Sequence, residues 1–581
     1  MFSWPRLFRP RAVEAPRPEQ APSSAPAPTP ATSKPTKVTA LPKGFPDWGA
    51  LVGASRAWTQ RRPGRRGRVL IATNIGGHGP ATVLESTLAA ALALRDAEVE
   101  IVLCDAALPA CLRAEYSDLP DDTVLTERRL PTTFCPACMH RGRAMFEPLG
   151  LKVHFLSELI SDEDRAQART IADSIPAAAI EDFALDGLKI GEHARAGALR
   201  YYTRGDLSGE PMGETVLRRY LEAAILSTAA YRKLLTDEVY DAAVFHHGLY
   251  VPQGPVGEVC RRLGVRVVNW VVAYRTNSFI LSHRDTYHHT LMDEPAADWE
   301  GMAWGDRQRA EITDYLKSRW NGARDWIGFH EKPEDDVRPL LTSMGVDLDR
   351  PIIGMLSNVV WDAQLHYPAN AFPSLVDWAL RTIEHFAGRP DLQLLLRIHP
   401  AEIRGTAPSR QPLLAEITRR FPVLPPNVYV IPPESPVSTY AAMELCDSVL
   451  IYATKMGVEL TSVGIPVIVA GEAWIKNKGL TLDAATPDRY LEILQTLPLG
   501  ERLGPEVVDR ALKYAYHFFF RRMIPLEFLK KTPSSLFFTP EIASADALAA
   551  GESRGLDVIC DAILDERPFI YPAETIGVHD P

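Results

Sequence analysis

Short apolar runs that end abruptly at polar or small residues recur in two parts of the chain. In the clearer part, residues 394–471, the runs LLLR, VYVI, SVLI and PVIV alternate with loops and amphipathic segments. Such runs predict buried parallel strands joined by helices. An earlier part begins with RVLIATN at 68–74, followed by a Gly-rich turn, an Ala/Leu-rich helix and VEIVLCD, and it continues with AAVF and VRVVNWVV. These βαβ patterns predict an α/β protein with two Rossmann-like lobes.

Length and composition indicate how the chain is divided. A chain of 581 residues is too long for one hydrophobic core. We predict a disordered Pro/Ala-rich tail over 1–45, an N-terminal Rossmann-like lobe over 46–340, a C-terminal Rossmann-like lobe over 341–500 and a helical extension over 501–581.

Charge and hydropathy restrict the partners. The formal net charge of -10, with Lys and Arg spread along the chain, argues against nucleic acid. No apolar run reaches the roughly 18 residues of a membrane span. The basic start MFSWPRLFRPR lacks the apolar core of a secretory signal. We therefore expect a cytoplasmic protein, and peripheral contact of that start with the inner face of the cell membrane stays open.

Polar residues follow the predicted strands of the C-terminal lobe, where ligands of open α/β sheets collect. They are Arg397, His399, Ser435, Thr454, Lys455 and Glu459. Arg397 can fork onto phosphate oxygens, and His399 can donate to a phosphate. Thr454 and Lys455 open a predicted helix whose first amides can bind an anion. A structural His-Pro turn and a glutamate that merely suits the helix dipole are the alternatives. Lys476 and Lys478 are expected at the rim of this site.

Four cysteines form a second group of interest. Cys104 and Cys111 precede Cys135 and Cys138, which share a Cys-x-x-Cys spacing. Two thiolates at that spacing can reach one ion, and the other two could complete a tetrahedral structural zinc site. Buried free thiols are the alternative, because Cys104 sits at a strand end and the spacing is not that of a standard zinc ribbon.

Two segments carry a family resemblance. RIHPAE at 397–402 and YATKMGVELTSVGIPVI at 452–468 resemble the nucleotide-sugar domain of bacterial capsule polysaccharide biosynthesis glycosyltransferases. The resemblance implies the two-lobed GT-B fold and a donor linked to CMP, UDP or GDP, with CMP-linked 3-deoxy-manno-octulosonic acid among the donors. It also implies a glycan or lipid-linked acceptor of the bacterial cell surface.

The same resemblance suggests roles for individual residues. Ser357, Asn358 and, as an alternative to a helix cap, Asp362 would approach the donor, and Glu459 would bind ribose or sugar hydroxyls. His78, in the turn GGHG, would be a general base, with a helix cap as the other interpretation. His399 would offset charge on the leaving group. No convincing metal-binding Asp-x-Asp motif is present, so catalysis is expected to require no cofactor.

Two other functions remain open. A CDP-polyol phosphotransferase also uses a His-Pro motif, and a non-catalytic sugar-binding or scaffolding component of capsule assembly would need no nucleotide at all.

Overall fold

The computed structural model describes residues 44–320, 324–326, 334–362, 370–405, 407–532 and 538–578. These residues belong to one compact unit. The predicted tail, apart from its last two residues, lies outside the described residues.

The first sheet has seven strands in the order β15-β8-β7-β6-β1-β2-β3. Their bounds are β1 Arg68–Asn74, β2 Glu98–Leu103, β3 Lys152–Phe155, β6 Ala242–His246, β7 Arg266–Val272, β8 Ser278–His283 and β15 Ile524–Pro525. Strands β3, β2, β1, β6 and β7 run parallel, whereas β8 and β15 are antiparallel to their neighbours. The order reverses between β1 and β6, which makes this pair the topological switch point of the sheet.

The second sheet has six strands in the order β11-β10-β9-β12-β13-β14. They are β9 Ile352–Leu356, β10 Gln393–Arg397, β11 Val428–Ile431, β12 Ser448–Ile451, β13 Val467–Val469 and β14 Leu482–Asp483, and all pair in parallel. This is the doubly wound Rossmann order, with its switch point between β9 and β12. The prediction of two Rossmann-like lobes, as in the GT-B fold, is confirmed.

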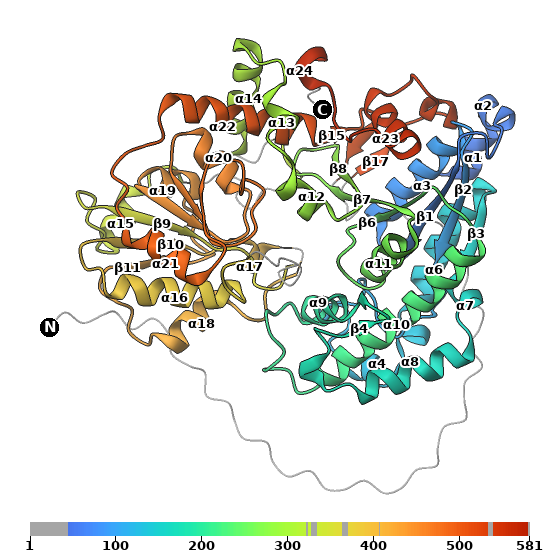
Figure 1. Ribbon diagram of the computed structural model, residues 1–581, viewed down its shortest axis with the longest axis horizontal. Helices are drawn as coiled ribbons and strands as arrows, with labels where there is room; N and C mark the ends of the chain where they lie inside the picture. The colour runs from blue at the N-terminus through green and yellow to red at the C-terminus, as the bar shows by residue number, and fades with distance from the viewer. Residues whose placement is uncertain are drawn as a thin grey trace, which may run out of the picture. The chain divides into compact units, whose positions relative to one another are not determined.

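Helices flank both sheets (Figure 1). The longer ones in the first lobe are α3 Gly79–Ala93, α6 Cys135–Phe146, α8 Asp162–Ser174, α9 Gly191–Tyr202, α10 Gly213–Asp237 and α11 Gln253–Leu263. In the second lobe they are α16 Leu375–Ala387, α18 Leu413–Arg420 and α21 Pro487–Gln495. Three further helices are α14 Asp306–Arg319, α22 Pro505–Tyr516 and α23 Arg554–Asp565. Every residue of α3 is buried, because its Ala/Leu-rich sequence has no polar face to turn toward solvent.

The final part of the chain returns to the first lobe. After α22, strand β15 pairs with β8 at Ile524 and Phe279. Figure 1 shows β17 Phe538–Pro540 and α23 beside the strands of the first sheet. The extension therefore contributes strands as well as the predicted helices.

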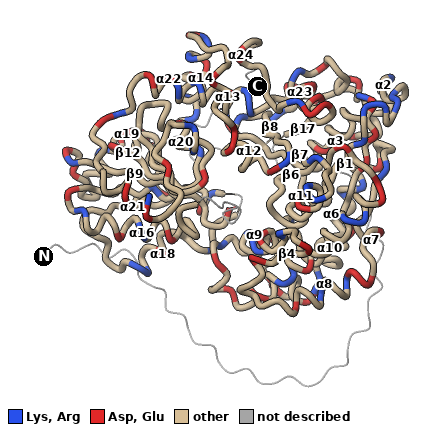
Figure 2. Tube along the Cα trace, in the orientation of Figure 1, with Lys and Arg blue, Asp and Glu red and all other residues tan. Residues whose placement is uncertain are grey.

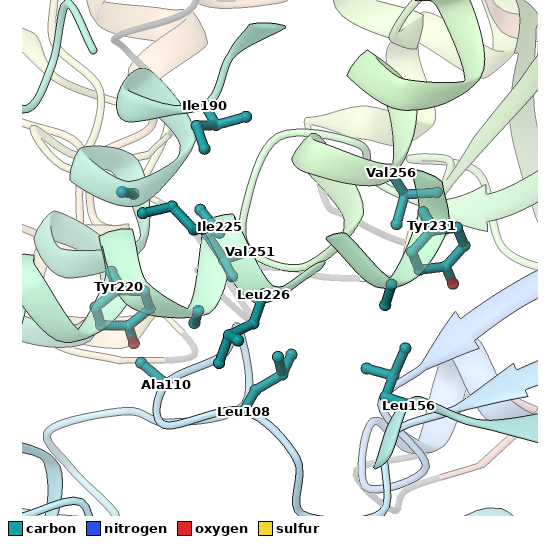
Figure 3. Packing of buried hydrophobic residues seen from close by; sticks show 14 of the residues in the cluster. Leu108, Ala110, Leu156, Ile190, Tyr220, Ile225, Leu226, Tyr231, Val251 and Val256 are labelled. Carbon is teal, nitrogen blue, oxygen red and sulfur yellow. The ribbon is translucent and has the colours of Figure 1, made fainter. Parts of the chain in front are cut away.

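Each lobe has its own hydrophobic core. In the first core, Leu226 and Tyr231 of α10 pack among apolar residues from the loops and helices of the same lobe (Figure 3). In the second, Trp378 of α16 packs over Tyr452 just after β12. These cores fix the strand ends from which the polar loops extend.

Charged residues of both signs are interspersed over both lobes (Figure 2). Within the described ranges, none of the helices combines the length and the apolar character needed to cross a membrane.

Candidate functional site

The switch point of the second sheet brings several predicted residues together. Ser357 and Asn358 follow β9, and Thr454 follows β12. The Asn358 Nδ2 donates to the Ala453 carbonyl at 3.0 Å, so its side chain bridges the two loops. The Ser357 hydroxyl accepts the backbone N–H of His399 at 2.9 Å. Loops from three neighbouring strands are thereby connected at the sheet edge where nucleotides bind in such folds.

His399 lies half-buried just after β10. Its Nδ1 accepts the backbone N–H of Ala401 at 3.0 Å, which orients the ring. The His-Pro turn therefore has the structural role that the sequence left open as an alternative. Its predicted contact with a phosphate stays a prediction.

Arg397 has a different environment from the one predicted for a phosphate ligand. Its side chain is buried, and its guanidinium donates to the carbonyl oxygens of Pro432 and, at 3.0 Å, of Ser435. Its Nε also reaches the Thr439 hydroxyl at 3.4 Å. Arg397 thus holds the loop after β11 in place and positions the predicted residue Ser435, which is half-buried.

Glu459 and Lys455 belong to a buried ionic network. Lys455 Nζ lies 3.1 Å from Glu459 Oε1, and Arg319 Nε lies 3.1 Å from Glu459 Oε2, which also accepts the Tyr440 hydroxyl. Burial alone would raise the pKa of Glu459, but the two cations lower it to about 2. The ammonium of Lys455 also lies 4.9 Å from the centre of the Tyr274 ring.

The helix after Lys455 is shorter than the anion-site prediction needs. Helix α20 spans only Met456–Ser462, and Lys455 at its N-cap makes no side-chain cap. The Thr454 hydroxyl instead accepts the Met456 N–H at 3.3 Å. Anion binding at this loop would therefore depend on side chains more than on the helix dipole.

The switch point of the first sheet presents imidazoles instead of charges. His78 follows β1 and begins α3, and its Nδ1 accepts the Ala81 N–H at 3.4 Å, so it caps the helix. Its ring stacks on that of His246 at the end of β6, with 4.9 Å between centroids. Burial, together with the nearby guanidinium groups of Arg200 and Arg113, lowers the pKa of His78 to about 4. Burial likewise keeps the pKa of His246 well below its usual value.

The loops of the two lobes contact each other. The Tyr250 hydroxyl, in the loop after β6, donates to Asp362 Oδ1 at 3.2 Å, in the loop after β9. A second contact lies further along the lobes, where Gln411 Oε1 accepts the backbone N–H of Gly205 at 2.8 Å.

The four predicted cysteines lie around one small cavity in the first lobe. Cys135 and Cys138 occupy the first turns of α6, Cys104 follows β2, and Cys111 lies in the next loop. Burial raises the pKa of the Cys104 thiol to about 12 and that of Cys138 to about 11. Within the ranges the structure describes, no group of three or more His, Cys, Asp or Glu side chains could hold a metal ion.

Two members of the ionic network, Arg319 and Tyr440, were not predicted from the sequence. Arg319 comes from the end of α14, and Tyr440 comes from the short helix α19 Thr439–Glu444. Their contacts with Glu459 join segments far apart in the chain, which no local spacing can show.

No protein-family model and no curated protein sequence matches the chain. Among solved structures, the KpsC beta Kdo 2,4 transferase of Thermosulfurimonas dismutans is 13% identical, with 53% of this chain and 87% of that chain aligned and a TM-score of 0.33. The calicheamicin glycosyltransferase CalG4 is 13% identical over 78% of this chain and 94% of that one, with a TM-score of 0.24. The Methanocaldococcus jannaschii UDP-GlcNAc 2-epimerase, solved with UDP-GlcNAc and UDP, is 12% identical over 77% and 98%, with a TM-score of 0.26.

Proposed function

We propose that the protein is a glycosyltransferase that moves a sugar from a nucleotide-sugar donor to a hydroxyl of a glycan or lipid-linked acceptor. The observation that carries this proposal is the contact between Tyr250 and Asp362, at 3.2 Å. It brings the loop after β6 against the loop after β9, so loops from the switch points of the two sheets lie side by side. A donor bound at one loop and an acceptor bound at the other would then be close to each other.

The second lobe would hold the donor. Ser357, Asn358 and Thr454 supply short polar side chains at the switch point, and Lys455 brings a cation to the same loops. During transfer the bond between the anomeric carbon and the phosphate oxygen breaks, and that oxygen leaves with the electron pair. Lys455 and His399 would offset the negative charge that develops on the phosphate.

The first lobe would receive the acceptor. The acceptor oxygen forms the new glycosidic bond and loses its proton, which requires a proton acceptor within reach. We assign this role to His78, whose imidazole is neutral near pH 7; its lowered pKa makes it a weak base, so it would take the proton only as the glycosidic bond forms. Because Nδ1 accepts the Ala81 N–H, Nε2 carries the hydrogen of the neutral ring, and Nδ1 would have to release the helix cap to take the proton.

Calorimetric titration of the full chain with CMP, CDP, UDP and GDP tests the donor site. We expect one nucleotide to bind, with at least a tenfold weaker affinity in His399→Ala. His385→Ala is the matched control, since His385 lies on α16 in the same lobe and away from the switch point. Equal affinity in both variants would contradict the assigned site.

Product analysis separates the remaining functions. A glycosyltransferase releases a nucleotide and leaves a glycosidic bond, whereas transfer from a CDP-polyol releases CMP and leaves a phosphodiester. If none of the four nucleotides binds, the donor-site proposal fails and the sugar-binding or scaffolding function takes its place.

A further inference from the structure

The Lys455 ammonium of the second lobe contacts an aromatic ring that belongs to the first lobe. Tyr274 follows β7, at the carboxyl end of a parallel strand, and its ring centre lies 4.9 Å from Lys455 Nζ. Lys455 lies in the loop after β12 of the second sheet. The two side chains are within the distance of a cation–π contact, so this contact joins loops from the two sheets.

The same ring also contacts the second cation of the ionic network. Arg319 Cζ lies 5.8 Å from the centre of the Tyr274 ring, and the Glu459 carboxylate is shared between Arg319 and Lys455. An aromatic face attracts a cation through its quadrupole and carries no formal negative charge. Tyr274 can therefore stabilise the ammonium without neutralising it, whereas a second carboxylate in its place would compete with a phosphate for that ammonium.

The position of the ring is restricted from two sides. The Trp326 N–H donates to the Tyr274 carbonyl at 3.1 Å, and the neighbouring Asp325 Oδ2 lies 2.5 Å from Arg319 Nη1. One short segment thus fixes both Tyr274 and Arg319. On the other side, the Tyr274 ring packs against Trp474 of the second lobe, with 5.9 Å between centroids. A ring held in this way can orient a flexible side chain that it contacts.

Lys455 has a side chain that benefits from such an orientation. A lysine ammonium sits on a flexible four-carbon stem and loses much rotamer freedom when it is fixed. The Lys455 side chain is 19% accessible, so it is mostly covered but remains open to solvent in part. Its ammonium has three N–H donors, of which Glu459 Oε1 accepts one at 3.1 Å. The other donors can meet a phosphate only if the ammonium keeps its place.

We propose that Tyr274 is a positioning residue of the donor site, and that its ring holds the Lys455 ammonium toward the phosphate of the donor. The inference rests on the proposed function, in which Lys455 offsets the charge of that phosphate. It implies that the first lobe completes the donor site, because a ring that follows β7 orients a cation that follows β12. No covalent bond forms or breaks at the ring.

Calorimetric titration of full-chain variants with CMP, CDP, UDP and GDP tests this role. Tyr274→Leu removes the aromatic face, and we expect the nucleotide that binds the wild type to bind about fivefold more weakly. Tyr274→Phe keeps the face and should bind within about twofold of the wild type. Tyr116→Leu is the matched control, because it removes a different cation–π contact between the lobes, in which Arg410 Cζ lies 3.7 Å from the Tyr116 ring centre.

Three results of this titration would overturn the inference. They are wild-type affinity in Tyr274→Leu, equal losses in Tyr274→Leu and Tyr116→Leu, and equal losses in Tyr274→Leu and Tyr274→Phe. The second result would assign the effect to packing between the lobes, and the third would assign it to the hydroxyl.

A double-mutant cycle shows whether the ring acts through the ammonium. In a Lys455→Met background, Tyr274→Leu should weaken nucleotide binding no further, and additive losses would overturn the inference. A fluorinated phenylalanine at position 274 keeps nearly the size of the side chain and withdraws electron density from the ring face. It should bind nucleotide more weakly than Tyr274→Phe, whereas a merely structural ring would leave the affinity unchanged.

The titration also separates this inference from the proposed function. If the wild type binds none of the four nucleotides, the proposed function fails and this inference fails with it. If Lys455→Met weakens binding and Tyr274→Leu does not, the inference alone is overturned.

Discussion

The two switch points share a topology and differ in their electrostatics. Both sheets reverse their strand order next to the first strand of the lobe, and both send loops with polar residues from that point. In the second lobe the loop after β12 is joined to buried charges, with Glu459 held between Lys455 and Arg319. In the first lobe, burial keeps His78 and His246 neutral.

Under the proposed function, this difference would let one backbone plan serve two chemical roles. A charged, hydrogen-bonded edge suits a phosphate-bearing donor, whereas neutral imidazoles suit a hydroxyl that must lose a proton. The fold fixes where the loops lie, and the burial of a few side chains decides their charge. The predictions below test each side of the comparison in turn.

Removing the central charge of the ionic network should have the largest effect. Glu459→Gln leaves two buried cations poorly compensated, and we expect the free energy of unfolding in urea to fall by about 3–5 kcal/mol. Glu492→Gln is the control, because the Arg489–Glu492 pair on α21 is exposed, with the Glu492 side chain 63% accessible. That control should change the free energy of unfolding by less than about 0.5 kcal/mol. Equal losses in the two variants would show that the buried network contributes no more to stability than an exposed ion pair.

The imidazole side predicts a pH dependence. His78 has a pKa of about 4 when folded and about 6.5 when unfolded. The unfolded chain therefore binds more protons between these values, and the free energy of unfolding decreases as pH falls through that window. His78→Asn keeps a helix cap but cannot titrate. In urea unfolding, the drop in the free energy of unfolding between pH 7 and pH 4 should therefore be about 3 kcal/mol smaller in this variant than in the wild type.

His140→Asn on α6 is the control for that experiment. It should keep the wild-type pH dependence. If His78→Asn also keeps it, the imidazole at the switch point is not held neutral by its surroundings.

A substitution of Arg397 tests whether this residue positions the loop after β11 or binds a phosphate directly. Arg397→Lys retains the charge but loses the fork that reaches the carbonyls of Pro432 and Ser435. We expect a loss of about 2 kcal/mol in stability even without nucleotide. Arg420 pairs with Glu384 at the surface, so Arg420→Lys is the control and should change the free energy of unfolding by less than about 0.5 kcal/mol. Unchanged stability with weaker nucleotide binding would instead favour the direct phosphate contact predicted from the sequence.

The contact between the lobes should have the smallest effect on stability. Tyr250→Phe removes the hydroxyl that donates to Asp362, which should lower the free energy of unfolding by about 1 kcal/mol. With a donor and acceptor in hand, it should raise KM for the acceptor more than it lowers kcat. A change in kcat alone would place Tyr250 in the chemical step.

The sequence predicted the fold better than the environments of the site residues. The strand predicted at 68–74 coincides with β1, and the one at 265–272 nearly coincides with β7, since buried parallel strands form continuous apolar runs. The prediction that Lys478 lies at the rim of the site is wrong, because this side chain is buried and donates to the carbonyls of Met292 and Glu294. Lys476 is buried as well.

These errors have one physical cause. The charge state and role of a buried side chain depend on partners from distant segments, as with Arg319 and Glu459. Local spacing predicts which residues follow a strand, but it contains no information on the segment that packs over them. The cysteine group is the contrasting case, because the sequence grouped four residues that the fold does bring to one cavity.

The short strand β15 restricts how this protein can be rearranged by recombination. Residues encoded after the second lobe complete the edge of the first sheet, where Pro525 pairs with Ser278. A gene fragment that ended with the second lobe would leave β8 with an open edge, which invites association with other strands. An exchange of the second lobe between two such genes would therefore have to replace an internal segment and keep the segments on both sides of it from one parent.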